Sequence, residues 1–128
     1  MKTYKVAVVG ATGMVGRKML QVLAERDFPV GELIPFASAK SAGSRIEYRG
    51  KKYTVVETNE ENINKYRPEI VIMSAGGKAS GIYSPMFAAA GGIVIDNSAY
   101  WRMDENVPLV VPEVNPEDIK WNKGVIAN

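Results

Sequence analysis

Three glycines are the residues of this sequence whose type and spacing point most directly to chemistry. Gly10, Gly13 and Gly16 stand three apart, directly after the apolar run 6–9 and directly before the amphipathic run 17–26. A strand, a glycine turn and a helix in this order direct free backbone N–H groups and the positive end of the helix dipole toward the turn, where they bind anions. In such a turn, Gly10 allows the sharp bend, Gly13 lets a pyrophosphate approach the backbone, and Gly16 lets the helix pack closely on the sheet. The spacing G-x-x-G-x-x-G is a relative of the dinucleotide fingerprint G-x-G-x-x-G and predicts nucleotide binding; the alternative is a structural turn that binds nothing.

The segment 38–44 is the second candidate site, because it follows the apolar run 33–37 that we expect to be the next parallel strand. At this position an acidic residue would accept a hydrogen bond from the ribose 2′-hydroxyl and select NAD. The segment contains no acid, and it offers three hydroxyls, those of Ser38, Ser41 and Ser44, together with the ammonium of Lys40. These groups suit a 2′-phosphate and therefore favour NADP. The alternative is a polar loop with a solvated lysine.

A third strand end carries small residues. The apolar run 68–73 is followed by Ser74, Ala75, Gly76 and Gly77. Small residues at this place let a cofactor lie against the backbone, so we interpret them as the second wall of a dinucleotide crevice. A simple turn explains the same residues equally well.

The fourth strand end carries polar residues that suit an anion. The apolar run 93–96 is followed by Asn97, Ser98 and Arg102, and open α/β sheets bind ligands at the carboxyl ends of their strands. The Arg102 guanidinium can hold a phosphate or a carboxylate with two parallel hydrogen bonds. The alternative is a surface arginine stacked on Tyr100 or Trp101.

The elements that position these residues form an α/β pattern. We expect a Rossmann-type, doubly wound and mostly parallel sheet with helices on both faces, formed by one domain over residues 1–128. Helices are predicted at 17–26, at 58–66 with Thr58 or Asn59 as cap, and at 78–90 with a break near Pro85. A hairpin is predicted from strands 45–49 and 52–57, and Pro35 argues against a central place for its strand. Asn115 is predicted to cap a helix that starts with proline, and 123–128 to form a last strand.

The composition excludes several classes of function. The 128 residues are 46% hydrophobic and carry a net charge of +2, so no electrostatic case exists for nucleic acid or a membrane surface. No apolar run approaches the roughly 20 residues of a membrane span, and we expect a cytoplasmic protein. The chain has no cysteine and no histidine, which excludes disulfides, thiolate nucleophiles, imidazole bases and nearly all zinc sites. No metal site is expected, and the chemistry must come from a bound cofactor or from residues outside the chain.

Five motifs in order resemble the N-terminal domain of bacterial aspartate-semialdehyde dehydrogenases. They cover residues 10–16, 37–43, 74–77, 94–98 and 107–115, so the resemblance extends over the whole chain. The family reduces L-aspartyl 4-phosphate to L-aspartate 4-semialdehyde with NADPH through a cysteine thioester and releases phosphate, in the biosynthesis of lysine, threonine and methionine. A domain similar to N-acetyl-gamma-glutamyl-phosphate reductase, or a non-enzymatic nucleotide-binding module, is the alternative.

The resemblance also implies roles for individual residues. Thr12, Gly13, Met14 and Val15 are expected to contact the pyrophosphate, Lys40 and Ser41 the 2′-phosphate, and Arg102 the phosphate of the substrate. The family's nucleophilic cysteine is expected just beyond Asn128, so we expect a cofactor domain that is inactive without its catalytic and dimerisation domain. The parent enzyme is expected to be a homodimer or a homotetramer. Lys40 replaces a frequent arginine, and residues 99–101 depart from the usual Ser-Ala-Phe.

Overall fold

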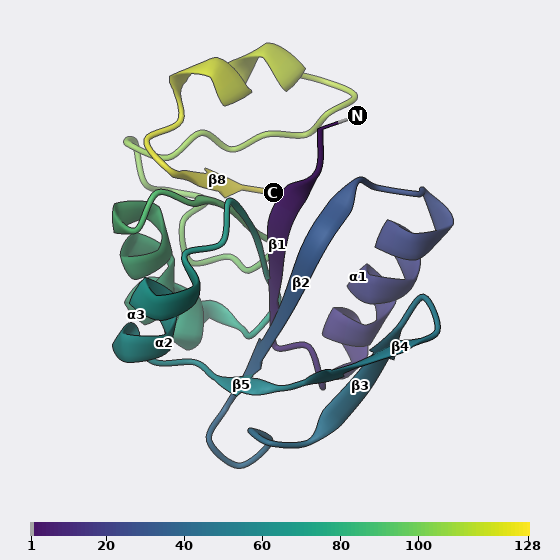
Figure 1. Ribbon diagram of the computed structural model, residues 1–128. Helices are drawn as coiled ribbons and strands as arrows, with labels where there is room; N and C mark the ends of the chain where they lie inside the picture. The colour runs from purple at the N-terminus through teal and green to yellow at the C-terminus, as the bar shows by residue number, and fades with distance from the viewer. Residues whose placement is uncertain (1) are drawn as a thin grey trace.

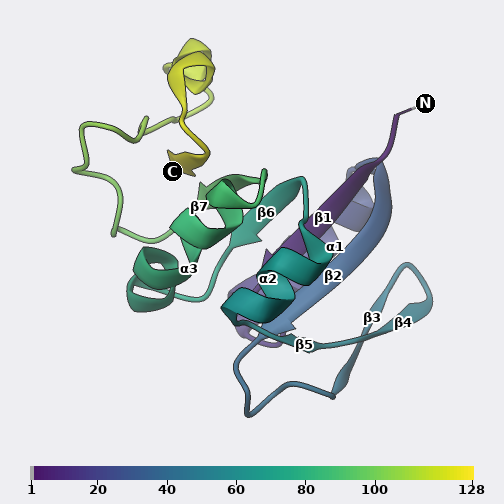
Figure 2. The same ribbon diagram turned by 60° about the vertical axis from the view of Figure 1, so that its left-hand side comes forward.

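A computed structural model describes residues 2–128, which form a parallel six-stranded sheet with helices on both faces (Figures 1 and 2). The strand order is β5-β2-β1-β6-β7-β8, and every neighbouring pair is parallel. This arrangement confirms the predicted fold class. The strands are β1 (Tyr4–Val9), β2 (Val30–Ala37), β5 (Val56–Glu57), β6 (Ile70–Met73), β7 (Ile93–Asp96) and β8 (Val125–Ala127).

Strand β1 lies inside the sheet and its last four residues are fully buried, because both of its faces are covered. An uninterrupted apolar run is typical of such a strand. Its neighbours are β2, which follows it through a helix, and β6, which comes from later in the chain. Pro35 in β2 is tolerated because β5 pairs only with Phe36 and Ala37, so β2 has one neighbour at the proline.

The helices divide between the two faces of the sheet. Helix α1 (Met14–Glu25) packs its Leu20 and Leu23 on one face, against Val6 and Val8 of β1. Helices α2 (Glu60–Tyr66) and α3 (Gly77–Ala89) cover the other face, where Ile63 and Phe87 join the core. Figure 2 shows α2 and α3 together on one side of the strands. Along residues 2–128, no helix has both the length and the apolar character needed to cross a membrane.

The hairpin between β2 and α2 is confirmed, with a difference in its second half. Strands β3 (Arg45–Tyr48) and β4 (Lys51–Thr54) pair antiparallel. The single strand predicted at 52–57 is wrong, because the chain leaves the hairpin at Val55 and continues as β5 in the main sheet. The Val55 carbonyl accepts a bond from the Gly43 N–H, and the Val55 N–H donates to the Ser44 carbonyl. These bonds hold the loop after β2 against Val55, the residue between β4 and β5.

Two local predictions, about a helix cap and a helix break, have different outcomes. Asn59 caps α2, since its side chain accepts a 2.8 Å bond from the Asn62 N–H. The break predicted near Pro85 is wrong: α3 runs through the proline, because Ser80, Ser84 and Phe87 are fully buried on one side of the helix and hold it against the sheet.

The remaining chain reaches β8 through an irregular segment and a 3₁₀ helix, η1 (Pro116–Trp121). Pro116 occupies the first turn as predicted. Asn115 holds the predicted N-cap position, but its side chain makes no capping bond to the helix. Its amide oxygen accepts from the Val111 N–H (2.8 Å), and its amide nitrogen donates to the Leu109 carbonyl and to Asp118. Asn115 therefore closes the turn that precedes the helix.

Candidate functional site

The candidate site lies where the carboxyl ends of β1, β2, β5 and β6 meet. The chain continues from β1 to β2 on one side and returns to β6 on the other, and this switch point is where open α/β sheets bind ligands. A cavity of about 330 Å³ opens there. It is lined by residues from four strand ends and from α3: Val9, Gly10, Ala37, Ser38, Ala39, Glu57, Thr58, Ala75, Ala79 and Tyr83.

The three glycines have different geometries in the turn. Gly10 has a φ of +85°, and a Cβ there would lie 2.8 Å from the Ser74 carbonyl oxygen. A Cβ on Gly16 would strike the Gly10 carbonyl and lie 2.7 Å from the Gly10 carbonyl carbon. A Cβ on Gly13 would meet only the Gly10 oxygen, at an ordinary 3.5 Å. Gly10 and Gly16 are therefore required by the fold, whereas the space beside Gly13 is open.

The start of α1 presents unpaired amides to this turn. Gly13 is the N-cap residue and has no side chain to accept a hydrogen bond, and the first turn of the helix contains no acidic residue. The N–H groups of Met14, Val15 and Gly16 have no acceptor inside an α-helix that begins at Met14. Because α1 begins three residues before the predicted 17–26, these amides lie directly beside the turn. The arrangement can bind an anion.

The loop after β2 meets the glycine turn through a pair of hydroxyls. Thr12 Oγ1 lies 3.4 Å from Ser41 Oγ, across the gap between the two segments. The Ser41 N–H donates to the Ser38 carbonyl, and Ser44 Oγ donates to the Ser41 carbonyl at 2.6 Å. Lys40 is exposed at the tip of this loop. The structure thus brings the predicted residues Thr12, Ser38, Lys40 and Ser41 into one region.

The end of β6 closes the other side of the turn. Ser74 Oγ donates a 2.9 Å bond to the Val9 carbonyl, so this hydroxyl ties β6 to β1. Gly76 has a φ of +91° and caps α3 without a side chain, and nothing lies within 4 Å of its absent Cβ. A Cβ on Gly77 would lie 3.7 Å from Tyr100 Cβ, which places Gly77 against the loop after β7.

The loop after β7 places Arg102 at the same edge of the sheet. Its Nε donates a hydrogen bond to the Asn128 carbonyl at 3.0 Å, and its Nη2 donates one to the Asn97 carbonyl at 3.2 Å. A guanidinium has five N–H donors, so donors remain for an anion. The alternative, in which Arg102 stacks on Tyr100 or Trp101, is not found. Among the described residues, the cations that lie over aromatic rings are Lys2, Lys51 and Lys65.

Ser98 has a structural role in this loop. Its hydroxyl donates a hydrogen bond of 2.5 Å to the carboxylate of the fully buried Asp96. The same hydroxyl accepts a bond from the Tyr100 N–H, and the backbone N–H of Ser98 donates a second bond to Asp96. The hydroxyl hydrogen is therefore committed to Asp96 in this structure. Asn97 contributes its backbone carbonyl to Arg102.

Tyr100 and Trp101 attach the same loop to α3. The Tyr100 ring occupies the space of a side chain at Gly81, where a Cβ would lie 2.6 Å from its Cε2. Trp101 Nε1 donates 3.0 Å to Ser80 Oγ, which is itself bonded to Ser84 Oγ inside the helix interface. The two rings meet edge to face at 4.8 Å. The departures at 99–101 therefore form the contact between loop and helix.

Sequence reasoning missed several residues of this region. Glu57 is the last residue of β5 and Thr58 follows it, at a place where the sequence pattern predicts the end of the hairpin. Ala79 and Tyr83 come from α3. Thr58 Oγ1 donates to the Ala37 carbonyl at 3.0 Å, so it joins the ends of β5 and β2. A polar residue directly after a strand was the available signal. It was not used, because the parallel pairing of β5 with β2 does not follow from the local pattern.

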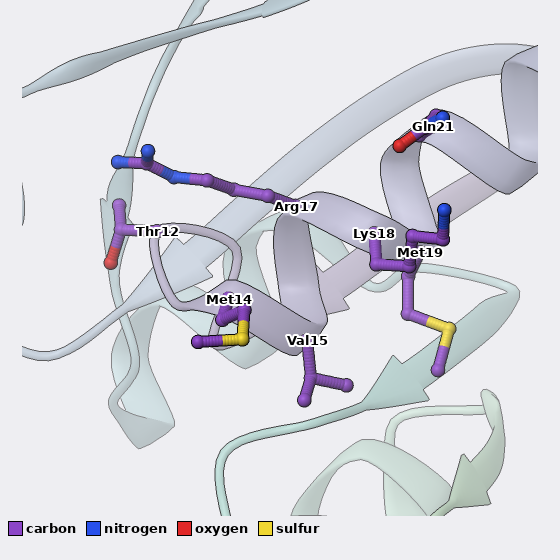
Figure 3. A pocket seen from close by; sticks show the side chains of 7 residues that line it. All are labelled: Thr12, Met14, Val15, Arg17, Lys18, Met19 and Gln21. Atoms are coloured by element: carbon purple, nitrogen blue, oxygen red, sulfur yellow. The ribbon is translucent and has the colours of Figure 1, made fainter.

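A second cavity, of about 720 Å³, lies along the outer side of α1 (Figure 3). Thr12, Met14 and Arg17 are among its lining residues. Figure 3 shows Arg17 extending back to the Thr12 side of the turn, while Lys18 lies farther along the helix. Side chains in a first helical turn point toward the N-terminus of the helix, which explains this direction.

Comparisons with known proteins identify what the chain resembles. A family model described as "Semialdehyde dehydrogenase, NAD binding domain" matches residues 5–122. Aspartate-semialdehyde dehydrogenase of Aquifex aeolicus is 56% identical over 127 residues, which cover 98% of this chain and 37% of that protein. The enzyme of Campylobacter jejuni is 53% identical over 130 residues, covering 99% of this chain and 38% of that protein. The chain thus spans less than two fifths of the length of these relatives.

Solved structures agree. Aspartate semialdehyde dehydrogenase II of Vibrio cholerae, complexed with ASA, superposes with a TM-score of 0.92 at 45% identity, over 99% of this chain and 42% of that chain. The enzyme of Candida albicans, solved with NADP, gives a TM-score of 0.77 at 26% identity, over 98% of this chain and 42% of that chain.

Proposed function

The chain belongs to the semialdehyde dehydrogenase family, whose NAD binding domain it matches, and from this premise we propose that it binds NADP(H) as the cofactor domain of an aspartate-semialdehyde dehydrogenase. The named relatives favour this activity over that of an N-acetyl-gamma-glutamyl-phosphate reductase. In the proposed reaction, the parent enzyme reduces L-aspartyl 4-phosphate and releases phosphate.

The observation that carries the choice of NADP is the loop at the end of β2. It contains no carboxylate to accept from a ribose 2′-hydroxyl, and it places Lys40 beside the Thr12–Ser41 contact. An ammonium and hydroxyl donors suit a 2′-phosphate, which an acid at this position would repel. The Candida albicans relative solved with NADP supports the same choice.

The residues present suit the pyrophosphate and the parts of the dinucleotide on either side of it. The free amides at the start of α1 and the open space beside Gly13 suit a pyrophosphate, and the cavity of about 330 Å³ lies within the range of small-molecule sites. Gly76 and Gly77 leave the end of β6 free of side chains. A bound nicotinamide cofactor would supply the hydride of the reaction, and the residues of this chain would bind and orient that cofactor.

Arg102 is proposed to hold the phosphate of the substrate. Its two carbonyl partners fix the guanidinium at the carboxyl edge, and the remaining N–H donors can take an anion bidentately. Asn97 stands beside it, and Ser98 shapes the loop through Asp96. We propose that Arg102 binds the phosphate of the substrate, and that Asn97 and Ser98 position the loop that carries it.

Calorimetric titration of the chain with NADPH and with NADH tests the proposal. We expect tighter binding of NADPH, and Lys40→Ala should remove one charge-assisted contact of about 1.5–3 kcal/mol for NADPH while leaving NADH unchanged. Lys120→Ala is the matched control, since it removes the same charge from η1, which precedes β8 and lies at the opposite edge of the sheet (Figure 1). An equal loss for both cofactors would refute the 2′-phosphate assignment.

A further inference from the structure

We propose that Arg17 is a second cation for the 2′-phosphate of the cofactor, working with Lys40 from the other side of the Thr12–Ser41 contact. The inference rests on the proposed function, and it assigns a specificity-determining residue that the glycine fingerprint does not include. Arg17 belongs to α1 and Lys40 to the loop after β2. The phosphate would therefore be held between the two segments that Thr12 and Ser41 bring together.

The position of Arg17 is the first part of the argument. Its backbone N–H donates to the Gly13 carbonyl at 3.0 Å, so its Cα is fixed in the first turn of α1. Its side chain extends back toward Thr12 and lines the outer cavity of α1 together with that residue (Figure 3). Thr12 Oγ1 is in turn 3.4 Å from Ser41 Oγ. Arg17 therefore lies on the side of the glycine turn that faces the loop after β2, the segment 38–44 that is proposed to bind the 2′-phosphate.

A neighbouring cavity extends the same region. Arg17 also lines a space of about 400 Å³ between α1 and β3, with Arg45, Ile46 and Glu47. Arg45 begins β3 directly after the loop that carries Lys40. Glu47 is the carboxylate that lines this space, but the ion pair found in residues 2–128 joins Arg49 to Asp27 elsewhere. Arg17 therefore keeps its charge free of an ion pair within the described chain.

The chemistry of the two cations is complementary. Lys40 supplies a point charge on a flexible stem, whereas the planar guanidinium of Arg17 supplies the fork that matches two phosphate oxygens. A ribose 2′-hydroxyl offers neither charge nor a second acceptor, so only a 2′-phosphate would engage both cations. The pair would raise the preference for NADP(H) without a change in the pyrophosphate site.

The experiment uses adenosine 2′,5′-bisphosphate and 5′-AMP as probes, because they differ only in the 2′-phosphate. Their dissociation constants are measured by calorimetry for the wild-type chain, Arg17→Ala, Arg17→Lys and Lys40→Ala. Lys18→Ala is the matched control, since it removes the same charge from the next residue of the same helix. We expect Arg17→Ala to weaken the bisphosphate about tenfold or more and 5′-AMP less than about twofold, with Arg17→Lys intermediate and Lys18→Ala close to wild type.

The possible failures are distinguishable. If Arg17→Ala weakens both probes equally, Arg17 contacts the adenine or the 5′-phosphate and the inference is wrong. If Lys40→Ala loses the preference for the bisphosphate and Arg17→Ala keeps it, the inference fails while the proposed function stands. A wild-type chain without any preference for the bisphosphate would overturn both.

Discussion

Gly16→Ala tests whether the packing of α1 on the turn sets the stability of the domain. The added methyl would strike the Gly10 carbonyl and lie 2.7 Å from its carbon and 2.9 Å from Ala11 Cα. All three atoms are backbone, so the helix start must move away from β1. Overpacking of this kind costs typically 1–3 kcal/mol, and the better helix propensity of alanine returns less than about 1 kcal/mol in a first turn.

The overpacking cost lies near the upper end of that range, about 3 kcal/mol, because no flexible side chain can yield. After the gain in helix propensity, we expect a net loss of about 2 kcal/mol in the free energy of unfolding. With an unfolding entropy of about 2.1 cal/mol/K per residue, this loss lowers the Tm of a chain of this size by about 7 °C. Thermal unfolding followed by circular dichroism measures it.

Gly13→Ala is the matched control, three residues earlier in the same turn. Its methyl would lie 3.5 Å from the nearest atom, and its φ of −80° is open to alanine. We expect a Tm within about 2 °C of wild type, and weaker NADPH binding because the methyl occupies the surface proposed for the pyrophosphate. An unchanged Tm for Gly16→Ala would refute the packing argument, and unchanged NADPH affinity for Gly13→Ala would place the pyrophosphate elsewhere.

Two further substitutions probe the hairpin and the loop after β7. Tyr48→Phe should raise the Tm by about 4 °C, because the Tyr48 hydroxyl is buried without a hydrogen-bond partner in the described chain and its removal relieves about 1 kcal/mol. Burial raises the pKa of this phenol, so the unfolded chain loses the phenol proton at a lower pH than the folded chain does. The stability of the wild type therefore falls as the pH rises past about 10. Between melts at about pH 8 and about pH 10.5, the Tm of the variant should fall less than the Tm of the wild type. Gly81→Ala should displace the Tyr100 ring and red-shift the emission of Trp101, recorded in a variant whose other tryptophan is phenylalanine, whereas Gly77→Ala, at 3.7 Å from Tyr100 Cβ, should not. Equal spectra for the two alanine variants would show that the ring is not held against α3.

The features that sequence predicts well here are those that neighbouring residues determine. The apolar run 6–9, followed by a glycine turn and an amphipathic helix, predicts an interior strand, and Gly10 suits the turn because the turn needs a positive φ. Pro85 shows the opposite case. A proline inside a helix is unfavourable locally, and only the burial of Ser80, Ser84 and Phe87 against the sheet explains why α3 continues through it.

The lining of the cavity shows where sequence reasoning reaches its limit. Glu57 and Thr58 belong to the site because β5 pairs with β2, and this pairing joins segments that are separated by a hairpin. The apolar alternation of 52–57 predicts a strand equally well whether it stays in the hairpin or leaves at Val55. The bonds of Val55 with Gly43 and Ser44 determine the outcome, and they are formed by backbone atoms that carry no sequence signal.

Arg17 illustrates the same limit for function. An arginine on an amphipathic helix is ordinarily a solvated surface residue, and its sequence neighbours give no reason to assign it another role. Its significance arises from its place in the first turn, which directs the side chain back toward Thr12, and from Ser41, which the sheet brings against Thr12 from a different segment. Cofactor preference in this domain would thus depend on a helix and a loop together. Arg17→Ala in the helix and Lys40→Ala in the loop should each reduce the discrimination between NADPH and NADH, and thermal melts of both variants should match the wild type.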